Sequence, residues 1–290
     1  MIKKLVWVFI FALFFSACSS QILEKEKKYF ETDLPETFVP TLVITKSADI
    51  PSDTPTPQIT IPDTPTNTSI PVFQVCSPVE SIKLEDITSM IYNPYYPPVA
   101  GSDDPHQGVD LSDVDLDTLI AKTGLGVNSI INGQVVMVLN GRFPYGNAVL
   151  VESTYDTLPP GWQKTVSNGP APANWGTVPA LTCPSGWDQD PESKSDPSIF
   201  VLYGHLENRS EVTQGQLLKC GEHIGSIGMS GNALSPHLHI EIRYGPPSGL
   251  TNSMAHYDTS ASLDEMSNYC QWRVSGWYRL LDPISLLLQQ

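Results

Sequence analysis

The chain has 290 residues, a formal net charge of −15 and 40% hydrophobic residues. This length suffices for one sizeable domain or two small ones. An acidic chain without clusters of Lys and Arg is a poor candidate for nucleic-acid binding, so we expect no nucleic-acid partner.

The N-terminal segment has the pattern of an export signal. Lys3 and Lys4 supply a positive start, and Leu5–Phe15 is an apolar core. This core is shorter than the about 20 apolar residues that a spanning helix needs. Small residues precede Cys18, as in a bacterial lipoprotein cleavage box. We predict that residues 1–18 are a lipoprotein-type signal peptide, and that the exported protein is anchored to a membrane through a lipidated Cys18, facing the cell envelope or exterior. An ordinary signal peptide is the alternative.

Residues 19–73 have the composition of a linker rather than of a folded domain. From about Glu31 the chain is rich in Pro, Thr, Ser and Asp, as in Thr54-Pro-Thr-Pro57 and Asp63-Thr-Pro-Thr-Asn-Thr68. Such stretches cannot bury a core, and Pro prevents regular strand pairing. We predict a semi-extended tether that gives the following domain reach.

Residues 74–290 form the predicted globular domain, and their patterns are mostly those of short strands. Runs rich in β-branched and aromatic residues are bounded by Gly, Asn or Pro. They are Ser129–Val138, Ala148–Ser153, Ile199–Tyr203 and Leu238–Ile242. Helical periodicity is weaker, and the best candidates are Glu80–Met90 and Asp264–Trp272. Short strands with turn signals favour a mainly β fold built on an antiparallel sheet or sandwich.

A long segment from about Tyr155 to Ser198 interrupts the strand pattern. It is rich in Pro, Gly and Asn and contains Trp162, Trp175 and Trp187. A loop of this length inside a compact domain is commonly functional or disordered. The Trp residues and a cysteine favour an ordered flap, which either lines a groove or packs against the sheet.

Cysteine usage agrees with export. Besides Cys18 the chain has four cysteines, Cys76, Cys183, Cys220 and Cys270. An even set in an oxidising compartment predicts disulfides, and three pairings are possible. No Cys-x-x-Cys occurs, which argues against a metal site made of thiolates.

Four histidines and one aspartate suit a catalytic metal site. They are His106, Asp110, His205, His237 and His239. Zinc takes nitrogen and oxygen ligands and keeps one position open for water when it is catalytic. A strand over 237–239 would place both of its histidines on one face and Leu238 in the core. Taken alone, that pattern is equally typical of a polar strand face.

The region after Asp110 also carries alternating carboxylates at Asp113, Asp115 and Asp117. Alternating oxygen ligands are a feature of calcium loops. The glycine of the sharp turn and the closing Glu of such loops are missing here. A solvated acidic loop is therefore the favoured interpretation, and calcium is the alternative.

Short motifs in a fixed order resemble those of the lysostaphin-like (LytM-type) peptidoglycan metalloendopeptidases. They are His106-Gln-Gly-Val-Asp110, Tyr145-Gly-Asn147, Tyr203-Gly-His-Leu206, Gly221-Glu-His-Ile-Gly225, Ser230-Gly-Asn232 and Pro236-His-Leu-His-Ile-Glu241. The resemblance covers about His106 to Tyr244 and is interrupted by the long segment. Ser235 stands where the family usually has Gly, and Glu222-His223 replaces a usual Gln and apolar pair.

The resemblance implies an antiparallel β fold with an open catalytic groove and one zinc ion. It implies that His106, Asp110 and His239 are the zinc ligands and that His205 and His237 are the catalytic histidines. The implied function is hydrolysis of peptide bonds in bacterial cell-wall peptidoglycan. The sequence does not divide the roles of acid, base and oxyanion partner between the two catalytic histidines.

Two other functions stay open at this stage. Some members of the family lack zinc ligands and regulate other wall hydrolases, so a non-catalytic zinc-binding regulator is the main alternative. The presence of all five expected residues argues against it. An enzyme that cuts other exported proteins with the same metal chemistry is a further possibility, because the long segment could reshape the groove.

Overall fold

The structure, a computed structural model, describes residues 74–96, 103, 106–115, 117–168, 181–189, 197–247, 250 and 252–289. The chain divides into two units, Met1–Pro65 and Thr66–Gln290, and every described residue belongs to the second. The predicted signal peptide, Cys18 and the whole of the tether lie outside the described residues and stay predictions. In the described part of the chain, no helix combines the length and the apolar character that crossing a membrane requires.

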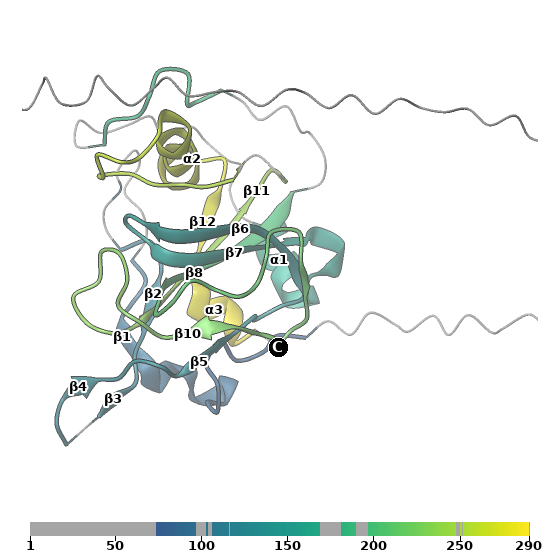
Figure 1. The fold of residues 1–290 in the computed structure, drawn as a ribbon. Helices are drawn as coiled ribbons and strands as arrows, with labels where there is room; N and C mark the ends of the chain where they lie inside the picture. Colours follow the sequence, from purple (N-terminus) through teal and green to yellow (C-terminus); the bar gives the residue numbers. More distant parts are fainter. Residues whose placement is uncertain are drawn as a thin grey trace, which may run out of the picture. The chain divides into compact units, whose positions relative to one another are not determined.

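One antiparallel sheet of eight strands organises the second unit (Figure 1). Its strands are β1 (Ile91–Asn93), β2 (Val109–Leu111), β6 (Gly133–Arg142), β7 (Gly146–Thr154), β8 (Ser198–Leu206), β9 (Leu217–Leu218), β11 (Leu238–Gly245) and β12 (Arg279–Leu281). Their order is β1-β2-β11-β8-β7-β6-β9, with β12 also paired to β11. Two small ribbons accompany the sheet, β3 (Val114–Asp115) with β4 (Ile120–Ala121) and β5 (Gly126–Asn128) with β10 (His223–Ser226). The predicted mainly β, antiparallel fold is confirmed.

All four predicted strands are present, but the first begins later than its sequence indicates. β6 starts at Gly133 rather than at Ser129 and continues to Arg142. Ile130 and Ile131 are nevertheless buried, which explains their apolar character. The backbone N–H of Ile130 donates to the Tyr203 hydroxyl at 2.8 Å. A side-chain oxygen therefore accepts the hydrogen bond that a backbone carbonyl of a neighbouring strand would accept in a sheet.

The helices are η1 (Leu84–Met90), η2 (Tyr155–Thr157), α1 (Pro160–Ser167), α2 (Leu263–Val274) and α3 (Pro283–Leu287). The first predicted helix is a 3₁₀ helix, η1, and the second is α2. A capping box explains the start of α2, since Ser262 accepts from the N–H of Glu265 while the Glu265 side chain accepts from the N–H of Ser262. Helices α1 and α3 were not predicted. Both carry Pro in their first turn, a position that suits it because no backbone N–H is needed there.

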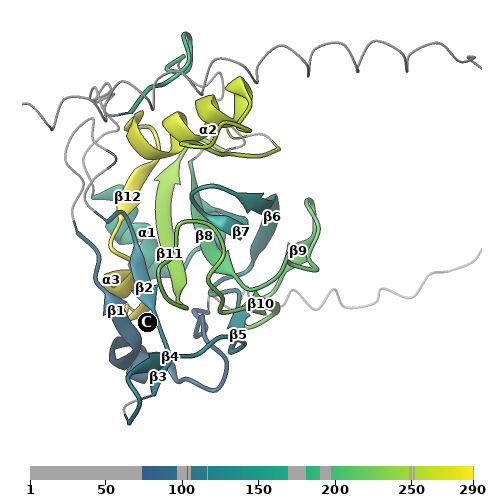
Figure 2. The same ribbon diagram turned by 60° about the vertical axis from the view of Figure 1, so that its left-hand side comes forward.

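The sheet is buried on both faces, by different elements. One core combines sheet residues with η1, α1 and α3, and it includes the fully buried Trp162 of α1. The other core packs α2 against the opposite face, with Trp272 and Tyr269 at its centre. Figure 2 shows α2 on one side of β11 and α1 and α3 on the other. The predicted open sheet is therefore covered by α2 over part of its groove face.

Two disulfides resolve the pairing that the sequence left open. Cys76 is joined to Cys220, and Cys183 is joined to Cys270. The second bond ties residues 181–189, from the long segment, to α2. At the other end of that segment, the Trp162 indole N–H donates to the carbonyl of Leu286 at 2.8 Å. The described parts of the segment therefore pack against the sheet and its helices, whereas Trp175 lies outside the described residues.

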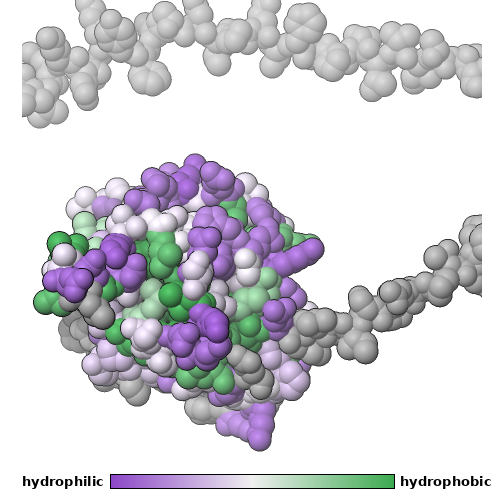
Figure 3. All heavy atoms as spheres, turned by 90° about the horizontal axis from the view of Figure 1, so that it is seen from below, coloured by the Kyte–Doolittle hydropathy of each residue, from purple (hydrophilic) through white to green (hydrophobic). Residues whose placement is uncertain are grey.

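Hydrophobic side chains reach the surface at several separate elements. Figure 3 shows the face seen from below, where hydrophobic residues are interspersed with hydrophilic ones. The exposed large hydrophobics include Leu119 between β3 and β4, Ile120 at the start of β4, Leu217 on β9 and Leu234 before β11.

Candidate metal site and groove

The pairing of β2 with β11 creates the centre of the site. His239 lies directly opposite Asp110 in the antiparallel register, and Gly204 of β8 lies opposite His239 on its other side. Leu238, Ile240 and Ile242 point into the core, as the alternation of a strand requires. His106 precedes β2, so the spacing from His106 to Asp110 is that of a turn into a strand, as expected.

Three ligand-type atoms converge at this point. His106 Nε2 lies 3.0 Å from Asp110 Oδ1 and 3.2 Å from His239 Nδ1. His239 Nδ1 lies 2.8 Å from the same oxygen. The three side chains form a group that could hold a metal ion, with ligand atoms within 4.8 Å of one another. Two imidazole nitrogens and one carboxylate oxygen fit the donor set of a catalytic zinc site.

The turn before β2 leaves no room for a side chain at Gly108. A Cβ added at Gly108 would lie 2.5 Å from Cε1 of His239 and 2.7 Å from the Ile240 carbonyl oxygen. No side chain fits there, because real Cβ contacts are longer than 3.0 Å. The glycine in the His-x-Gly-x-Asp motif therefore allows the backbone to approach the His239 ring.

Partners outside the ligand group orient Asp110 and His106. Asn93 of β1 donates its side-chain amide to Asp110 Oδ2 at 3.2 Å, leaving Oδ1 for the ligand group. His106 Nδ1 lies 3.1 Å from the carbonyl of Pro94. A carbonyl only accepts, so this nitrogen carries the hydrogen and Nε2 faces the ligand group. Sequence patterns did not identify Asn93 as a hydrogen-bond partner of Asp110, because nothing in the run from Ile91 to Asn93 marks its side chain as facing β2.

His205 reaches the site through an irregularity at the end of β8. In a regular strand it would point away from the face that Gly204 shares with His239. Its backbone φ is +60°, a left-handed conformation that non-glycine residues seldom adopt, and this turns the side chain to the groove. Its Nδ1 donates to the carbonyl of Ser230 at 2.7 Å. The imidazole of His205 lies 4.7 Å from that of His237, between ring centroids.

The Tyr-Gly-Asn and Ser-Gly-Asn motifs meet behind His205. The hydroxyl of Ser230 donates to the Leu206 carbonyl at 2.7 Å and accepts from the N–H of Asn147 at 2.9 Å. Gly146 has a φ of +71°, and a Cβ there would lie 2.4 Å from the backbone of Ser230. These motif residues therefore fix the carbonyl that orients His205.

His237 sits at the entry to β11 beside an exposed tyrosine. Its Nδ1 donates to the carbonyl of Ser235 at 2.8 Å, and its Nε2 lies 3.6 Å from Asp110 Oδ1. The ring of Tyr92 stacks on it, with centroids 6.4 Å apart. The structure thus brings together all five residues singled out from the sequence.

Burial and charge set the protonation of these groups. Burial, together with the nearby His239 and His237, lowers the pKa of His205 to about 3. Burial also lowers the pKa of His237, although Asp110 opposes it. Burial raises the pKa of Asp110, but hydrogen bonds from His106 and His239 outweigh it and hold that pKa below its usual range. His205 and His237 are therefore neutral and Asp110 is ionised near pH 7.

His239 differs from the other histidines. Burial lowers its pKa, but the carboxylates of Asp110 and Glu241 outweigh burial and raise it to about 9. A metal ion that binds His239 must displace this proton, so binding would release it.

A buried charged network lies under the metal site. Glu241 has no solvent exposure, and its Oε1 accepts from Arg243 Nε at 2.5 Å. Its Oε2 accepts from the Tyr145 hydroxyl at 2.7 Å and from Arg273 at 3.2 Å. Arg243 also donates to the side-chain oxygen of Gln107. The strand pattern placed Glu241 on the groove face, but α2 covers it there.

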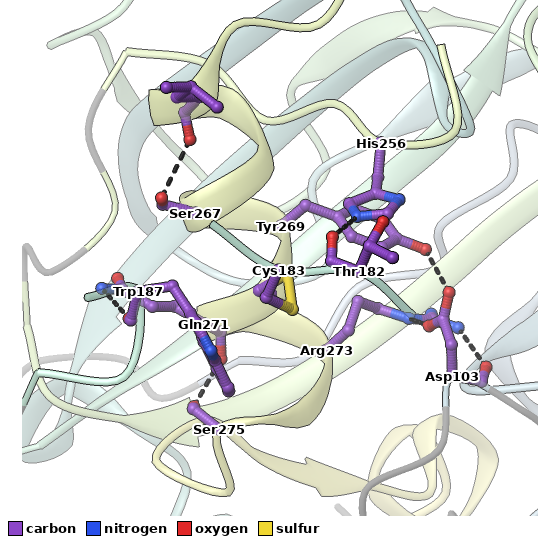
Figure 4. Close-up of a disulfide and its surroundings, with 12 residues drawn as sticks. Asp103, Thr182, Cys183, Trp187, His256, Ser267, Tyr269, Gln271, Arg273 and Ser275 are labelled. Atoms are coloured by element: carbon purple, nitrogen blue, oxygen red, sulfur yellow. Dashed lines mark hydrogen bonds and ion pairs between the residues drawn. A yellow bond between two sulfur atoms is a disulfide. The ribbon is translucent and has the colours of Figure 1, made fainter. Parts of the chain in front are cut away.

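The remaining candidate groups lie away from this centre. Asp115 Oδ1 accepts from the N–H groups of Asp117 and Thr118 at 3.0 Å, and Lys122 lies 3.4 Å from its other oxygen. That carboxylate therefore stabilises the β3–β4 turn. Figure 4 shows His256, whose Nε2 donates to the Thr182 carbonyl at 2.7 Å and so binds the long segment beside α2.

A groove of about 670 Å³ gives access to the candidate metal site. The five candidate residues line it, together with others that include Tyr92, Leu234, Leu181, Tyr257 and Asp103. Leu181 and Tyr257 come from the long segment and from the loop before α2. The long segment therefore contributes to the groove as well as to the packing.

Comparisons with known proteins agree with the motifs. The sequence profile described as "Peptidase family M23" matches residues 190–252. The match contains His205, His237 and His239, whereas His106 and Asp110 precede it and α2 follows it. It supports the resemblance to LytM-type peptidases at the level of the family.

Several solved structures are similar to this chain. The catalytic domain of the antimicrobial peptidase lysostaphin from Staphylococcus simulans is 17% identical, with 71% of this chain and 97% of that one covered and a TM-score of 0.34. The catalytic domain of the prophage-encoded M23 protein EnpA from Enterococcus faecalis is 19% identical, with 55% and 84% covered and a TM-score of 0.32. A zinc-containing peptidase from Vibrio cholerae is 19% identical, with 59% and 35% covered and a TM-score of 0.30. Similarity this low does not transfer an activity.

Proposed function

We propose that this chain, whose residues 190–252 belong to peptidase family M23, is a zinc-dependent endopeptidase that hydrolyses peptide bonds of bacterial cell-wall peptidoglycan. The observation that carries the proposal is the convergence of His106, Asp110 and His239 in an open groove that His205 and His237 also line. Attachment through a lipidated Cys18 belongs to the same proposal, because it would keep the enzyme at the cell envelope.

The donor set determines what the site would hold. His106, Asp110 and His239 would bind one zinc ion, which supplies Lewis-acid polarisation of a substrate carbonyl and activation of water near neutral pH. Asn93 and the carbonyl of Pro94 keep two of these ligands in orientation. Such supporting hydrogen bonds fix the tautomer and direction of metal ligands.

His205 and His237 would move the proton during hydrolysis. Each donates its Nδ1–H to a backbone carbonyl, of Ser230 and Ser235, which leaves Nε2 as the acceptor. Burial keeps both rings neutral near pH 7, so each can take a proton from water. Because the same burial disfavours the charged ring, a ring that has taken the proton readily gives it to the leaving amine, or donates it in a hydrogen bond to the developing oxyanion.

Digestion of purified cell walls tests this function. The chain without residues 1–18 would be incubated with sacculi, with and without a zinc chelator, and released fragments would be identified by mass spectrometry. We expect chelator-sensitive fragments with new amino termini. His239→Ala should lower their release by more than about 1,000-fold, since it removes a ligand of an ion that contributes several kcal/mol to the transition state.

A matched control separates loss of the ligand from general damage. Glu211 is exposed and is not among the groove-lining residues, so Glu211→Ala should leave the rate unchanged. Folding of both variants would be checked by circular dichroism. Bound zinc without wall cleavage would favour the non-catalytic regulator or another exported substrate, and absence of zinc binding would overturn the metal site itself.

A further inference from the structure

Arg273 connects α2 to the two segments that carry the candidate metal ligands. Its Nε donates to Asp103 Oδ1, and its Nη2 donates to the Asp103 backbone carbonyl at 2.9 Å. Its Nη1 lies 3.2 Å from Glu241 Oε2. Asp103 precedes His106 by three residues, and Glu241 follows His239 by two. Figure 4 shows Arg273 extending from α2 to Asp103, beside the disulfide that Cys183 forms with Cys270.

The hydrogen bonding of His239 distinguishes it from the other histidines of the site. In His106, His205 and His237, a backbone carbonyl accepts the hydrogen of Nδ1. His239 directs Nδ1 to the ligand group instead, so a neutral His239 that binds a metal through Nδ1 carries its hydrogen on Nε2. That nitrogen is buried without a hydrogen-bond partner at normal distance. The nearest acceptor is Glu241 Oε2, at 3.5 Å.

The position of Glu241 Oε2 depends on α2. Arg243 holds the other oxygen, Oε1, from within β11. Oε2 is held by the Tyr145 hydroxyl at 2.7 Å and by Arg273. With Glu241 fully buried, its charge requires both arginines, because an unpaired buried carboxylate is strongly unfavourable. Arg273 is therefore the cation on the side of the carboxylate that faces His239.

We propose that Arg273 is a positioning residue for the metal ligand His239. By holding Glu241 Oε2 beneath the imidazole, it fixes the tautomer that carries hydrogen on Nε2 and presents Nδ1 to the metal. A helix outside the M23-matched region thus takes part in forming the metal site. The inference rests on the ligand set of the proposed function, but not on which peptide bond is cut.

Zinc affinity of matched arginine variants tests the proposal. Arg273→Met removes all donors, and Arg273→Lys keeps the charge but cannot reach both carboxylates as a fork does. The control is Arg142→Met, because Arg142 also pairs with a carboxylate of α2, Glu265 at 2.7 Å, away from the ligands. The dissociation constant of zinc would be measured on the folded chain by competition with a chromophoric chelator.

We expect Arg273→Met to weaken zinc binding by about 10- to 100-fold, as loss of groups that orient a ligand typically does. Arg142→Met should stay within about threefold of the original chain, since the groups around the ligands are unchanged. In nitrogen NMR spectra of the zinc-loaded chain, the His239 Nε2–H should be ordered in the original and Arg142→Met chains, and exchange faster in Arg273→Met.

Each of three results would overturn the inference. The first is an unchanged zinc affinity in Arg273→Met. If that variant does not fold, unchanged affinity in Arg273→Lys has the same meaning. Equal weakening in Arg142→Met shows that Arg273 only docks the helix. Failure of the original chain to bind zinc would instead refute the proposed function, so the two failures are distinguishable.

Discussion

The two halves of β11 present the same face of one strand to different surroundings. His239, at its start, and His237, directly before it, line an open groove. Glu241 and Arg243, further along that face, are 0% and 3% exposed because α2 lies over them. Strand alternation places all four side chains on one side of the sheet. Because α2 covers only part of β11, one half of the strand is accessible to a substrate and the other half contains buried ion pairs.

The difference shows how a strand can carry reactive and structural polar groups together. In the open half, His237 has a lowered pKa and donates to a backbone carbonyl, whereas His239 is paired with the carboxylate of Asp110. The covered half contains full charges, and each is matched by opposite charges from β11 and α2. A buried charge left alone costs several kcal/mol, so each charge in the covered half needs its partner.

The largest expected effect comes from removing the charge at the centre of the covered half. Glu241→Leu leaves Arg243 and Arg273 buried without their shared carboxylate. We expect the free energy of unfolding to fall by about 3–5 kcal/mol, measured by urea denaturation. Glu211→Leu, on the exposed surface, should change it by less than about 0.5 kcal/mol. Similar small changes in both variants would show that the covered half does not depend on charge pairing.

The folding stability contributed by His205, which lines the groove from β8, should depend on pH. The pKa of His205 is about 3 in the folded chain and near 6.5 when unfolded. Below pH 6.5 the unfolded chain binds a proton that folded His205 does not, so stability is present above that pH and is lost as pH falls toward 3. For metal-free protein, His205 should contribute a loss of about 2 kcal/mol between pH 7 and pH 5.

The other titrating groups of the site also contribute to the pH dependence of stability, each in a direction that its pKa shift sets. His237 has a lowered pKa and contributes in the same direction. His239 has a raised pKa of about 9, so its contribution is present below pH 6.5 and is lost only as pH rises through 9. The lowered pKa values of Asp110 and Glu241 affect stability only below about pH 4.

His205→Asn isolates the histidine contribution. Asparagine tolerates the left-handed backbone at this position and does not titrate. Thermal unfolding of the chelator-treated variant between pH 7 and pH 5 should show a smaller loss of stability than the original chain. An unchanged pH dependence would assign the loss to other groups.

The smallest effect is expected at the rim of the groove. Leu234 is fully exposed and lines the groove beside the candidate site. Leu234→Ser should change the free energy of unfolding by less than about 0.5 kcal/mol, because it loses no buried area. If the rim holds substrate, KM for wall peptides should rise by a few-fold with kcat unchanged. A fall in kcat alone would place Leu234 outside the binding surface.

The sequence predicted the parts of the site that depend on local patterns. Alternation along the strand placed His237 and His239 on one face and Ile240 in the core, and Ile240 is buried there. The register of β11 with β2 comes from the structure. It did not predict that α2 would cover Glu241, because helical periodicity carries no information about which sheet face a helix joins. Spacing alone also left the disulfide pairing open.

Contacts between distant segments explain the rest. Arg273 and Asp103 are 170 residues apart, and Asn93 and Asp110 are 17 apart on different strands. No pattern within either segment marks such partners. The left-handed backbone of His205 was equally hidden, because non-glycine residues seldom adopt it.

Under the proposed attachment through Cys18 and the predicted tether, the Cys76–Cys220 disulfide would have a mechanical consequence. A pulling force on the chain ahead of Gln74 meets Cys76 first, and the covalent bond shares the load with Cys220, between β9 and β10. Without that bond, tension would continue into η1 and then into the edge strand β1, which could be unzipped from β2 one residue at a time. The disulfide therefore isolates Asn93, and through it Asp110, from strain on the tether.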